Sequence, residues 1–474
     1  MAYKNEKASK FAYQTIIKDK SVQEFLKQCY IPEIDELKKI NFKKISKDLE
    51  DLENVYENEI NKILVIDGGY QVIDISKNRF EIMKIAFYSC GIMSFDYNLL
   101  LDLNEQQTVN PNEINNIKTL YKQNFTLPVQ LISLKGYSFI DSIRKSIYDI
   151  FAQKSLFYNN GEIDKDSIFI DTIKWLAFEE YLEGKGTLNV NCPVCDTEIK
   201  FEKKNNDYKN KNDVLRCKKC YENGNNTIVY ITDIFGFHLK IEDNNSETIV
   251  SLLLNIFEVI MLFTSYRVII EKKDIKAMAK FLFIKDGSLA IYDFHHKDTF
   301  VSLKIIPFLS FLFKKSIEDK KNYLSIVGIE KSGYFYSHLQ KIKNMLKDKT
   351  VLIPDNDYIQ KNITFENKIM GKYTNFGIKM FYHHSKGFSY VMQFPFPTLL
   401  KNKPMYEYEK FLKKPNIKYF INLKNIIEIL TETKSSKYEG GIIPIILVNK
   451  QVSVSRNPGY KMLKEFTKEE LFKD

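Results

Sequence analysis

Four cysteines have the spacing of a metal site. Cys192 and Cys195 form one CxxC pair, Cys217 and Cys220 form a second, and 21 residues separate the pairs. The two-residue spacer lets both thiolates of a pair reach one ion, and two pairs supply the four ligands that structural zinc prefers. Because four sulfur ligands leave no open position, we expect this zinc to stabilise a fold. A redox role is the alternative, but neither pair lies in a strand-to-helix pattern of thioredoxin type.

Two aspartates stand at the ends of apolar runs and precede glycine. Asp67 follows ILVI, and Asp286 comes just after FLFI. Runs that are apolar at every position suit strands covered on both faces, so each aspartate is expected where a buried strand emerges near the centre of a sheet. Two carboxylates placed there could share divalent cations. The alternative is that both are turn formers, since Asp-Gly is a common hairpin signal.

Glu258 favours the metal hypothesis. It is the sole acidic residue in the stretch 249–270, which is apolar on all faces of a helix. Burying an unpaired carboxylate there is costly unless it meets a cation or takes up a proton. The alternatives are a protonated Glu258 or one paired with an arginine such as Arg267. Asp67, Glu258 and Asp286 together have the makeup of a hard-cation site for phosphodiester cleavage, with oxygen ligands for Mg²⁺ or Mn²⁺.

The elements that must position these side chains alternate between strands and helices. The segment ILVIDGGYQVIDI predicts a strand, a tight turn at Gly68-Gly69 and a returning strand, and FLFIKDGSLAIYDF repeats this plan. Further strands are expected in YLSIVGI, TVLIP, GIKMFYHH, FSYVMQF and GIIPIILV, with helices such as HLQKIKNMLKDK between them. The pattern predicts an α/β or α+β fold whose sheet is assembled from both sides of the cysteine-bearing segment.

The chain divides into four parts. Residues 1–60 are rich in Lys, Glu and Asp with apolar residues at helical spacing, which predicts a helical N-terminal arm. The core begins over 61–185, is interrupted by the polar zinc insertion over 186–230, and resumes over 231–474. The 474 residues therefore form one large core with an insert, although length alone suggests about three domains.

Composition and charge limit the classes of protein to which the chain can belong. A hydrophobic content of 44% supports a large globular core, and an excess of ten basic over acidic residues suits a polyanionic partner such as nucleic acid. The stretch 249–270 is long enough to cross a bilayer, but Asn255, Glu258 and Arg267 interrupt it, so a buried helix is expected and a membrane span is the alternative. The N-terminal segment has no apolar core of a secretory signal, and paired cysteines suit a reduced compartment, so we expect a cytoplasmic protein.

The order of these motifs resembles the NurA family of nucleases, particularly its bacterial members with a zinc-ribbon insertion. From about residue 60 onward the resemblance is carried by VIDGGYQVID, CPVC, CKKC, TIVYITDIFGFH, LNIFEVI, FLFIKDGSLAI, GIEKSG, VLIPDNDYI and YEGGIIPIILVNK. It implies an RNase H-like core, with a mixed sheet flanked by helices, in a Mn²⁺- or Mg²⁺-dependent DNA nuclease. It also implies a homodimer and a hexameric HerA-type ATPase partner that pumps DNA to the nuclease.

The resemblance assigns roles to individual residues. Asp67 matches the first family aspartate and Asp286 matches the aspartate of the Asp-Gly turn, so both would be metal ligands. The family glutamate lies on the helix before that turn, which favours Glu258, with Glu271 as the alternative. Asn449 stands where the family often carries a histidine, so the chain departs from the family pattern there.

Two further residues have weaker assignments. Lys331 in GIEKSG could neutralise charge on the phosphate during cleavage, an electrostatic role for which a point charge suffices. Its alternative is a solvated loop lysine. Tyr438 is a candidate for a C-terminal tyrosine of the family, although its spacing differs.

These observations lead to two hypotheses. The first is a deoxyribonuclease, exonuclease and/or single-strand endonuclease, with catalytic Asp67, Glu258, Asp286 and Lys331, acting in DNA end processing or in anti-phage defence. Metal-held water would attack the phosphate in line, and a second cation and Lys331 would take up the developing charge. The second is a non-catalytic zinc-ribbon DNA-binding adaptor with a degenerate nuclease core. No Walker-type loop occurs in the sequence, so ATP-driven movement of DNA requires a partner.

Overall fold

The structure is a computed structural model of the chain. It describes residues 10–29, 37–56, 59–76, 82–105, 118–159, 162–182, 184–203, 207–210, 212–292, 299–369, 371–385, 387–396, 404–435, 438, 440–454 and 459–472.

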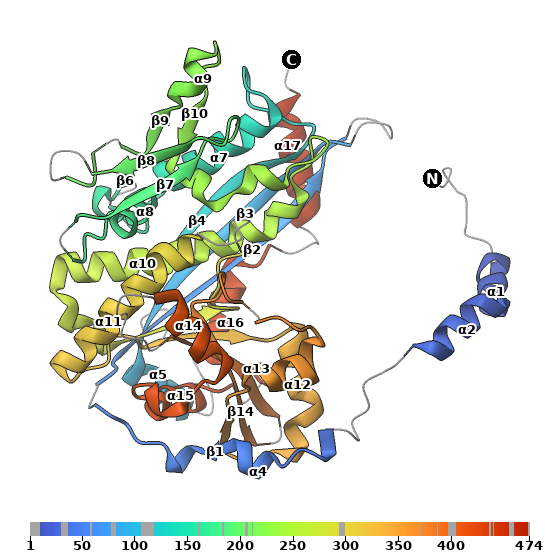
Figure 1. Cartoon of the computed structure of the whole chain (residues 1–474), viewed down its shortest axis with the longest axis vertical. Coiled ribbons are helices and arrows are strands. Elements are labelled where there is room, and N and C mark those ends of the chain that lie inside the picture. Colours follow the sequence, from blue (N-terminus) through green and yellow to red (C-terminus); the bar gives the residue numbers. More distant parts are fainter. Residues whose placement is uncertain are drawn as a thin grey trace.

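A large mixed sheet forms the centre of the molecule (Figure 1). Within the described ranges it has nine strands in the order β1-β13-β14-β15-β12-β11-β2-β3-β4. Their bounds are β1 Ser46–Asp48, β2 Lys62–Asp74, β3 Lys84–Asp96, β4 Lys118–Gln130, β11 Phe281–Asp286, β12 Ile326–Glu330, β13 Thr350–Leu352, β14 Gly377–Ser385 and β15 Phe388–Pro395. The strands β2, β3 and β4 form an antiparallel meander, β11 is parallel to β2 and to β12, and the remaining neighbours pair antiparallel.

Helices cover both faces of this sheet. The bounds of the helices are α1 Lys10–Lys18, α2 Lys20–Gln28, α4 Phe42–Ile45, α5 Tyr97–Glu105, α7 Phe139–Gln153, α8 Phe169–Ala177, α9 Lys218–Glu222, α10 Val250–Lys273, α11 Ile306–Asp319, α12 Gly333–Ile342, α13 Asn356–Ile359, α14 Pro404–Lys413, α15 Leu423–Glu432, α16 Ile443–Val452 and α17 Gly459–Leu471. Gly68 faces α10 through Leu254, whereas Gly69 faces Val452 of α16. Since successive residues of a strand point to opposite faces, α10 and α16 cover opposite sides of β2.

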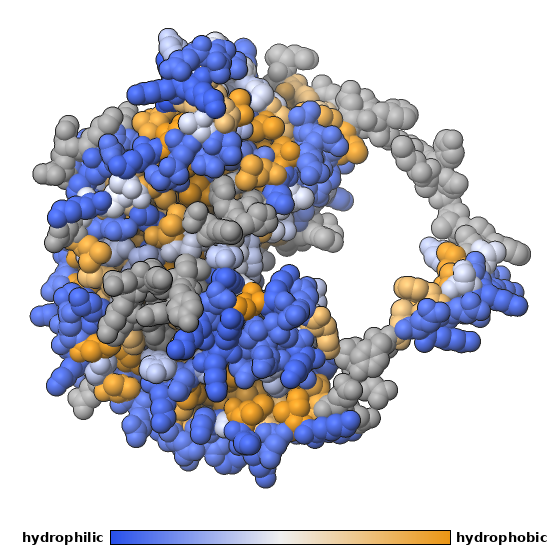
Figure 2. Space-filling view, viewed as in Figure 1, coloured by the Kyte–Doolittle hydropathy of each residue, from blue (hydrophilic) through white to orange (hydrophobic). Residues whose placement is uncertain are grey.

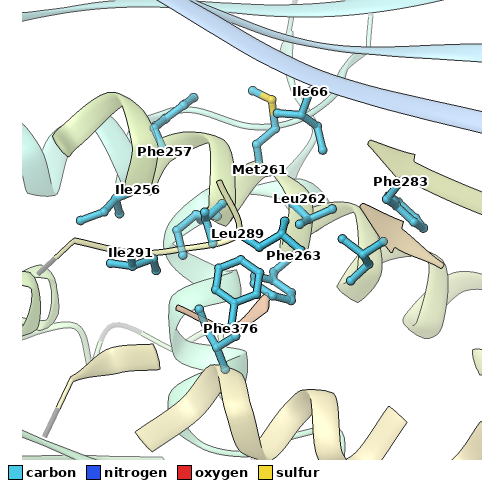
Figure 3. Close-up of a cluster of buried hydrophobic side chains, with 14 of the residues drawn as sticks. Ile66, Ile256, Phe257, Met261, Leu262, Phe263, Phe283, Leu289, Ile291 and Phe376 are labelled. Carbon is cyan, nitrogen blue, oxygen red and sulfur yellow. The ribbon is translucent and has the colours of Figure 1, made fainter. Parts of the chain in front are cut away.

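The helix α10 is the centre of the core, as its apolar composition predicts. Figure 3 shows Phe257, Met261 and Phe263 of this helix packed with side chains from the sheet, among them Ile66 and Phe283. The segment Glu247–Lys273 is the one helix of the described residues that is long and apolar enough to cross a membrane, and 72% of its most apolar window is buried inside the molecule. The expected buried helix is therefore confirmed.

The predicted turn at Gly68-Gly69 is wrong. The strand β2 runs unbroken through both glycines, which pair with Cys90 and Ser89 of β3. The glycines serve close packing, because a Cβ atom at Gly68 would lie 2.7 Å from Leu254 Cδ1 and one at Gly69 would lie 3.1 Å from the Val452 carbonyl oxygen. Local turn propensity is overridden by two helices that press on the strand from both sides.

The second Asp-Gly turn is present, but residues 288–292, the part of the expected returning strand that the structure describes, do not form a strand. The strand β11 ends at Asp286, and Gly287 has a φ of +109°, a conformation that favours glycine. The chain then folds onto the sheet without joining it as a strand, and Ala290 makes only an isolated bridge with Asn375.

Of the other elements predicted from the sequence, some are confirmed and some are wrong. The strands predicted in YLSIVGI, TVLIP, GIKMFYHH and FSYVMQF are confirmed as β12, β13, β14 and β15. The segment GIIPIILV is wrong as a strand, because Ile443–Val452 is the helix α16 with its proline in the first turn, where proline is tolerated. The stretch that follows Phe42 is not a continuous helix, since Ser46–Asp48 pairs with β13 as an edge strand.

Three parts stand outside the main sheet. The arm helices α1 and α2 project from the body in Figure 1, and Figure 2 shows hydrophobic residues on them. Residues 1–9, 30–36 and 57–58 of the predicted arm lie outside the described residues. The cysteine-bearing insertion contains β7 (Thr187–Asn191) paired with β8 (Glu198–Glu202), and β9 (Val214–Arg216) paired with β10 (Ile228–Tyr230). A further short hairpin, β5 (Tyr158–Asn159) with β6 (Glu162–Ile163), precedes α8.

Candidate catalytic site

The two aspartates are neighbours at the centre of the sheet. In the parallel pairing of β11 with β2, Lys285 lies opposite Ile66, so the residues that follow, Asp286 and Asp67, stand next to each other on adjacent strands. Both side chains lie on one face, opposite to Lys285, because side chains alternate along a strand. Asp67 thus lies in the middle of the long strand β2, whereas Asp286 ends β11 as expected.

Asp67 has a buried oxygen that accepts no hydrogen bond. The residue is 5% exposed; its Oδ1 accepts from the Gly68 amide at 2.8 Å, and its Oδ2 is buried without a hydrogen-bond partner. Burial raises the pKa of Asp67 to about 7, with further contributions from the charges of Asp286 and Glu258. An uncompensated buried carboxylate is costly, and an oxygen of this kind is a preferred ligand of Mg²⁺ and Mn²⁺, so the geometry fits a hard cation.

Asp286 connects this position to an open groove. Its Oδ2 accepts a hydrogen bond from Lys331 Nζ at 2.8 Å, and Lys331 is the more exposed partner, at 41% against 14%. The groove has a volume of about 600 Å³, and its lining includes Asp286, Ser288, Lys331, Tyr334, Lys379 and Asn449. The proposed phosphate-neutralising lysine therefore lies beside one candidate ligand and faces solvent.

Glu258 approaches β2 from the helix α10, on the face of the sheet where Lys285 lies, and it is already paired. Its Oε2 lies 2.6 Å from Lys285 Nζ, and the two side chains are only 6% and 2% exposed. Burial raises the pKa of Glu258, and the charge of Lys285 opposes this shift. Its Oε1 lies 3.0 Å from where a Cβ atom of Gly68 would stand, so the glycine permits the approach of the helix to β2.

Glu271 lies elsewhere on the same helix. It is thirteen residues beyond Glu258, which corresponds to about 20 Å along a helix. There it forms an ion pair with Arg267 at 3.1 Å and accepts a hydrogen bond from the Tyr208 hydroxyl at 2.6 Å. Of the two candidates for the third acid, Glu258 is therefore the one near the aspartates, and Arg267 is not its partner.

The four cysteines converge as the sequence predicts. Their Sγ atoms all lie within 4.8 Å of one another, with Cys192 and Cys220 3.7 Å apart and Cys195 and Cys217 3.5 Å apart. A tetrahedral zinc with bonds of about 2.3 Å separates its sulfur ligands by about 3.8 Å, so these positions fit one metal ion. Among the described residues this is the one group of three or more possible ligands drawn together so closely, and the three acids are spaced more widely.

The other predicted residues lie near the groove or outside it. Asn449 of α16 lines the groove with Asp286. Tyr438 is exposed in the segment before α16.

The sequence reasoning missed Lys285. The signal is present, since Lys285 is a charged residue within a strand that is otherwise apolar, and its face is covered by the helix that carries Glu258. A buried lysine requires a partner, and the sole acid of the apolar helix is the obvious one. Lys285 and Glu258 each stand out in the sequence as a charged residue in an apolar segment, and the ion pair between them accounts for both.

A second missed feature holds the Asp-Gly turn in place. The Gln393 side chain is buried, and its Oε1 accepts from the Leu289 amide at 2.8 Å. Its Nε2 donates to Glu330, which also accepts from Lys379. These residues come from β15, β12 and β14, so the position of the turn after Asp286 is set by the far half of the sheet.

Comparison with known proteins adds little to this geometry. No family model matches the chain, and no curated protein sequence matches it. Among solved structures, the chain is similar to the crystal structure of the NurA nuclease from Sulfolobus solfataricus, at 10% identity, with 98% of each chain covered and a TM-score of 0.30. A TM-score of this size does not establish a shared fold, so the case for a function rests on the site itself.

Proposed function

We propose that this chain is a divalent-metal-dependent deoxyribonuclease, a hydrolase that cleaves DNA phosphodiester bonds. The observation that carries the proposal is the buried Oδ2 of Asp67, which has no hydrogen-bond partner, on the strand next to Asp286. Asp286 and Lys331 both line the groove. Paired carboxylates next to a solvent-open groove with a lysine suit the cleavage of an anionic backbone.

Each residue has a part in this scheme. Asp67 and Asp286 would hold Mg²⁺ or Mn²⁺, and Glu258 contributes the third negative charge. The bound ion would activate water and stabilise the leaving oxygen. Lys331 neutralises charge on the phosphate, and its hydrogen bond to Asp286 keeps its ammonium group at the groove. The exposed amide of Asn449 can orient a phosphate oxygen by hydrogen bonding, but it cannot serve as a base at neutral pH.

The wider setting is part of the same proposal. The antiparallel meander β2-β3-β4, continued by the parallel strands β11 and β12, supports an RNase H-like core. We place the chain in the NurA family on its motif order, as an exonuclease and/or single-strand endonuclease. It would be a cytoplasmic homodimer that receives DNA from a HerA-type hexameric ATPase in DNA end processing or anti-phage defence. The four cysteines would hold a structural zinc.

The test compares the two aspartates with an aspartate outside the site. Asp67→Asn and Asp286→Asn are incubated with linear and single-stranded DNA in Mn²⁺, Mg²⁺ or a metal-free buffer, with and without the ATPase. Both variants should lose cleavage by at least about a thousandfold, about 4 kcal/mol of activation free energy. Asp149→Asn, which alters a half-buried pair with Lys145 on α7 away from the site, should cleave normally. Unimpaired cleavage by both site variants would disprove the assignment.

The adaptor hypothesis is favoured by two observations. Lys285 already neutralises Glu258, and Asn449 replaces a histidine, as in a core that has lost its chemistry. Under this hypothesis wild-type protein binds DNA but shows no metal-dependent cleavage under any of the same conditions. The assay above therefore decides between the two functions.

A further inference from the structure

The pair formed by Lys285 and Glu258 bears on how many metal ions the site can hold. Lys285 Nζ lies 2.6 Å from Glu258 Oε2 and 3.4 Å from the main-chain oxygen of Asp286. Both side chains are buried, and Asp286 is the next residue after Lys285. A fixed ammonium group therefore already stands between the third carboxylate and the strand that carries the second aspartate.

The oxygens of the three acids are unequally available. One Glu258 oxygen is bound by Lys285, and the other is turned towards the main chain at Gly68. One Asp67 oxygen accepts from the Gly68 amide, whereas its Oδ2 accepts no hydrogen bond. One Asp286 oxygen is bound by Lys331 at the groove. Asp67 therefore offers a buried oxygen without a donor, and its side chain lies on the same face of the sheet as that of Asp286 and on the face opposite to that of Lys285.

The charges lead to the same conclusion. When ionised, the three carboxylates exceed the two lysine ammonium groups by a single negative charge. One divalent ion more than compensates this excess. A second divalent ion beside Glu258 would be repelled by the buried ammonium group of Lys285, and no water would screen this repulsion.

We infer that Lys285 takes the place of a second divalent cation, so that the site holds a single Mg²⁺ or Mn²⁺ ion at Asp67 and Asp286. This inference rests on the proposed nuclease function and replaces the two-ion scheme expected from the sequence. Lys285 is a positioning residue in this arrangement, because it acts through Glu258 and does not touch the reacting phosphate.

The buried location argues for a role at the site. A buried ion pair contributes little to stability compared with apolar residues of similar volume, so stability alone does not explain its presence. The chain offers a matched comparison in the pair Lys174 and Asp171, which is equally buried, at 2.8 Å, but lies within the helix α8.

The experiment counts Mn²⁺ ions bound to the zinc-loaded full-length protein, by electron paramagnetic resonance of free Mn²⁺ in equilibrium titrations. Wild type should bind one ion per chain, and Asp67→Asn should bind none. Lys285→Met should bind two, because Glu258 is then free to act as a ligand. Lys174→Met removes an ion pair of the same kind away from the site and should still bind one.

A double variant keeps the inference testable if Lys285→Met does not fold. Lys285→Met with Glu258→Met removes both charges together, and it should bind one ion, because Asp67 and Asp286 are sufficient. The inference is overturned if wild type binds two ions, if Lys285→Met binds only one, or if the double variant binds none. A wild type that binds two ions, both lost in Asp67→Asn, overturns the single-ion inference and leaves the nuclease proposal intact. Absence of Mn²⁺ binding in wild type overturns the nuclease proposal itself.

Discussion

Asp67 is a carboxylate held in a place that disfavours its charge. Its pKa is raised to about 7 from an ordinary 3.8, first by burial and then by Asp286 and Glu258. The folded state therefore binds a proton more tightly than the unfolded state does. Stability from this group is fully present below pH 4 and is lost as the pH rises through 7.

The first prediction concerns this pH dependence. Without divalent cations other than zinc, Asp67→Asn should gain stability relative to wild type as the pH rises from 4 to 8, by up to about 4 kcal/mol. Urea unfolding at several pH values measures the difference. Added Mn²⁺ should stabilise wild type at pH 8 and leave the variant unchanged. A stability difference that is the same at pH 4 and pH 8 would contradict the buried carboxylate.

The second prediction concerns Gly68. A methyl group there would meet Leu254 Cδ1 at 2.7 Å, Cys90 Sγ at 2.9 Å and Glu258 Oε1 at 3.0 Å. Gly68→Ala should therefore cost roughly 1–3 kcal/mol of unfolding free energy and reduce cleavage, because Glu258 must move.

Denaturant unfolding combined with a double variant tests the cause. Leu254→Ala removes the nearest contact, so Gly68→Ala and Leu254→Ala together should cost less than the sum of the separate changes. Strictly additive costs would show that crowding against α10 is not the reason for the glycine.

At the scale of elements, we expect the cysteine-bearing insertion to depend on a metal ion for its fold, because its four cysteines converge. Its strands form two-stranded pairs, which are marginally stable by themselves in water. Arg144 of α7 connects the insertion to the core by donating a hydrogen bond to the Ile228 carbonyl oxygen at 2.5 Å, and it also pairs with the core residue Asp233 at 2.6 Å. The insertion thus has its own possible metal site and an attachment to the core.

The third prediction follows from this arrangement. Cys217→Ser should lower the zinc content from one ion per chain, as measured by mass spectrometry of the metal. Limited proteolysis should then cut within 186–230, while the core keeps its thermal transition. Cys29→Ser is the control, because Cys29 is exposed on the arm and should retain the zinc. Loss of the core transition in Cys217→Ser would show that the insertion is not an independent element.

At the scale of the whole molecule, the groove beside Asp286 is where an extended polyanion would bind. Lys331 and Lys379 both line it, although Lys379 is tied to Glu330. The overall excess of ten basic residues matters less than these few charges at the site.

The fourth prediction is a salt dependence. DNA binding by a non-cleaving Asp286→Asn protein should weaken with salt, since phosphate contacts release counterions. Adding Lys331→Ala should reduce the slope of log K against log salt by about 1 and weaken binding equally for different DNA sequences. Fluorescence anisotropy at several salt concentrations measures both. An unchanged slope would place Lys331 outside the DNA contact.

Local patterns in the sequence were enough to predict much of this protein. The CxxC spacing identified the four converging cysteines, the apolar stretch identified the buried helix α10, and the Ile- and Val-rich runs identified most strands. These features depend on residue types at short range, which a sequence displays directly. The candidate acids were found for the same reason, since a lone Glu258 in an apolar helix stands out.

Only the tertiary structure decided what those acids contact. Contacts between residues far apart in sequence determine three features. The strand β2 continues through its glycines, residues 443–452 form the helix α16, and Gln393 accepts a hydrogen bond from Leu289 just after the Asp-Gly turn. The pairing of Glu258 with Lys285 likewise depends on where a helix crosses a strand. Sequence periodicity specifies which face of an element is apolar, but the partner on that face is chosen by packing and by the need to neutralise buried charge.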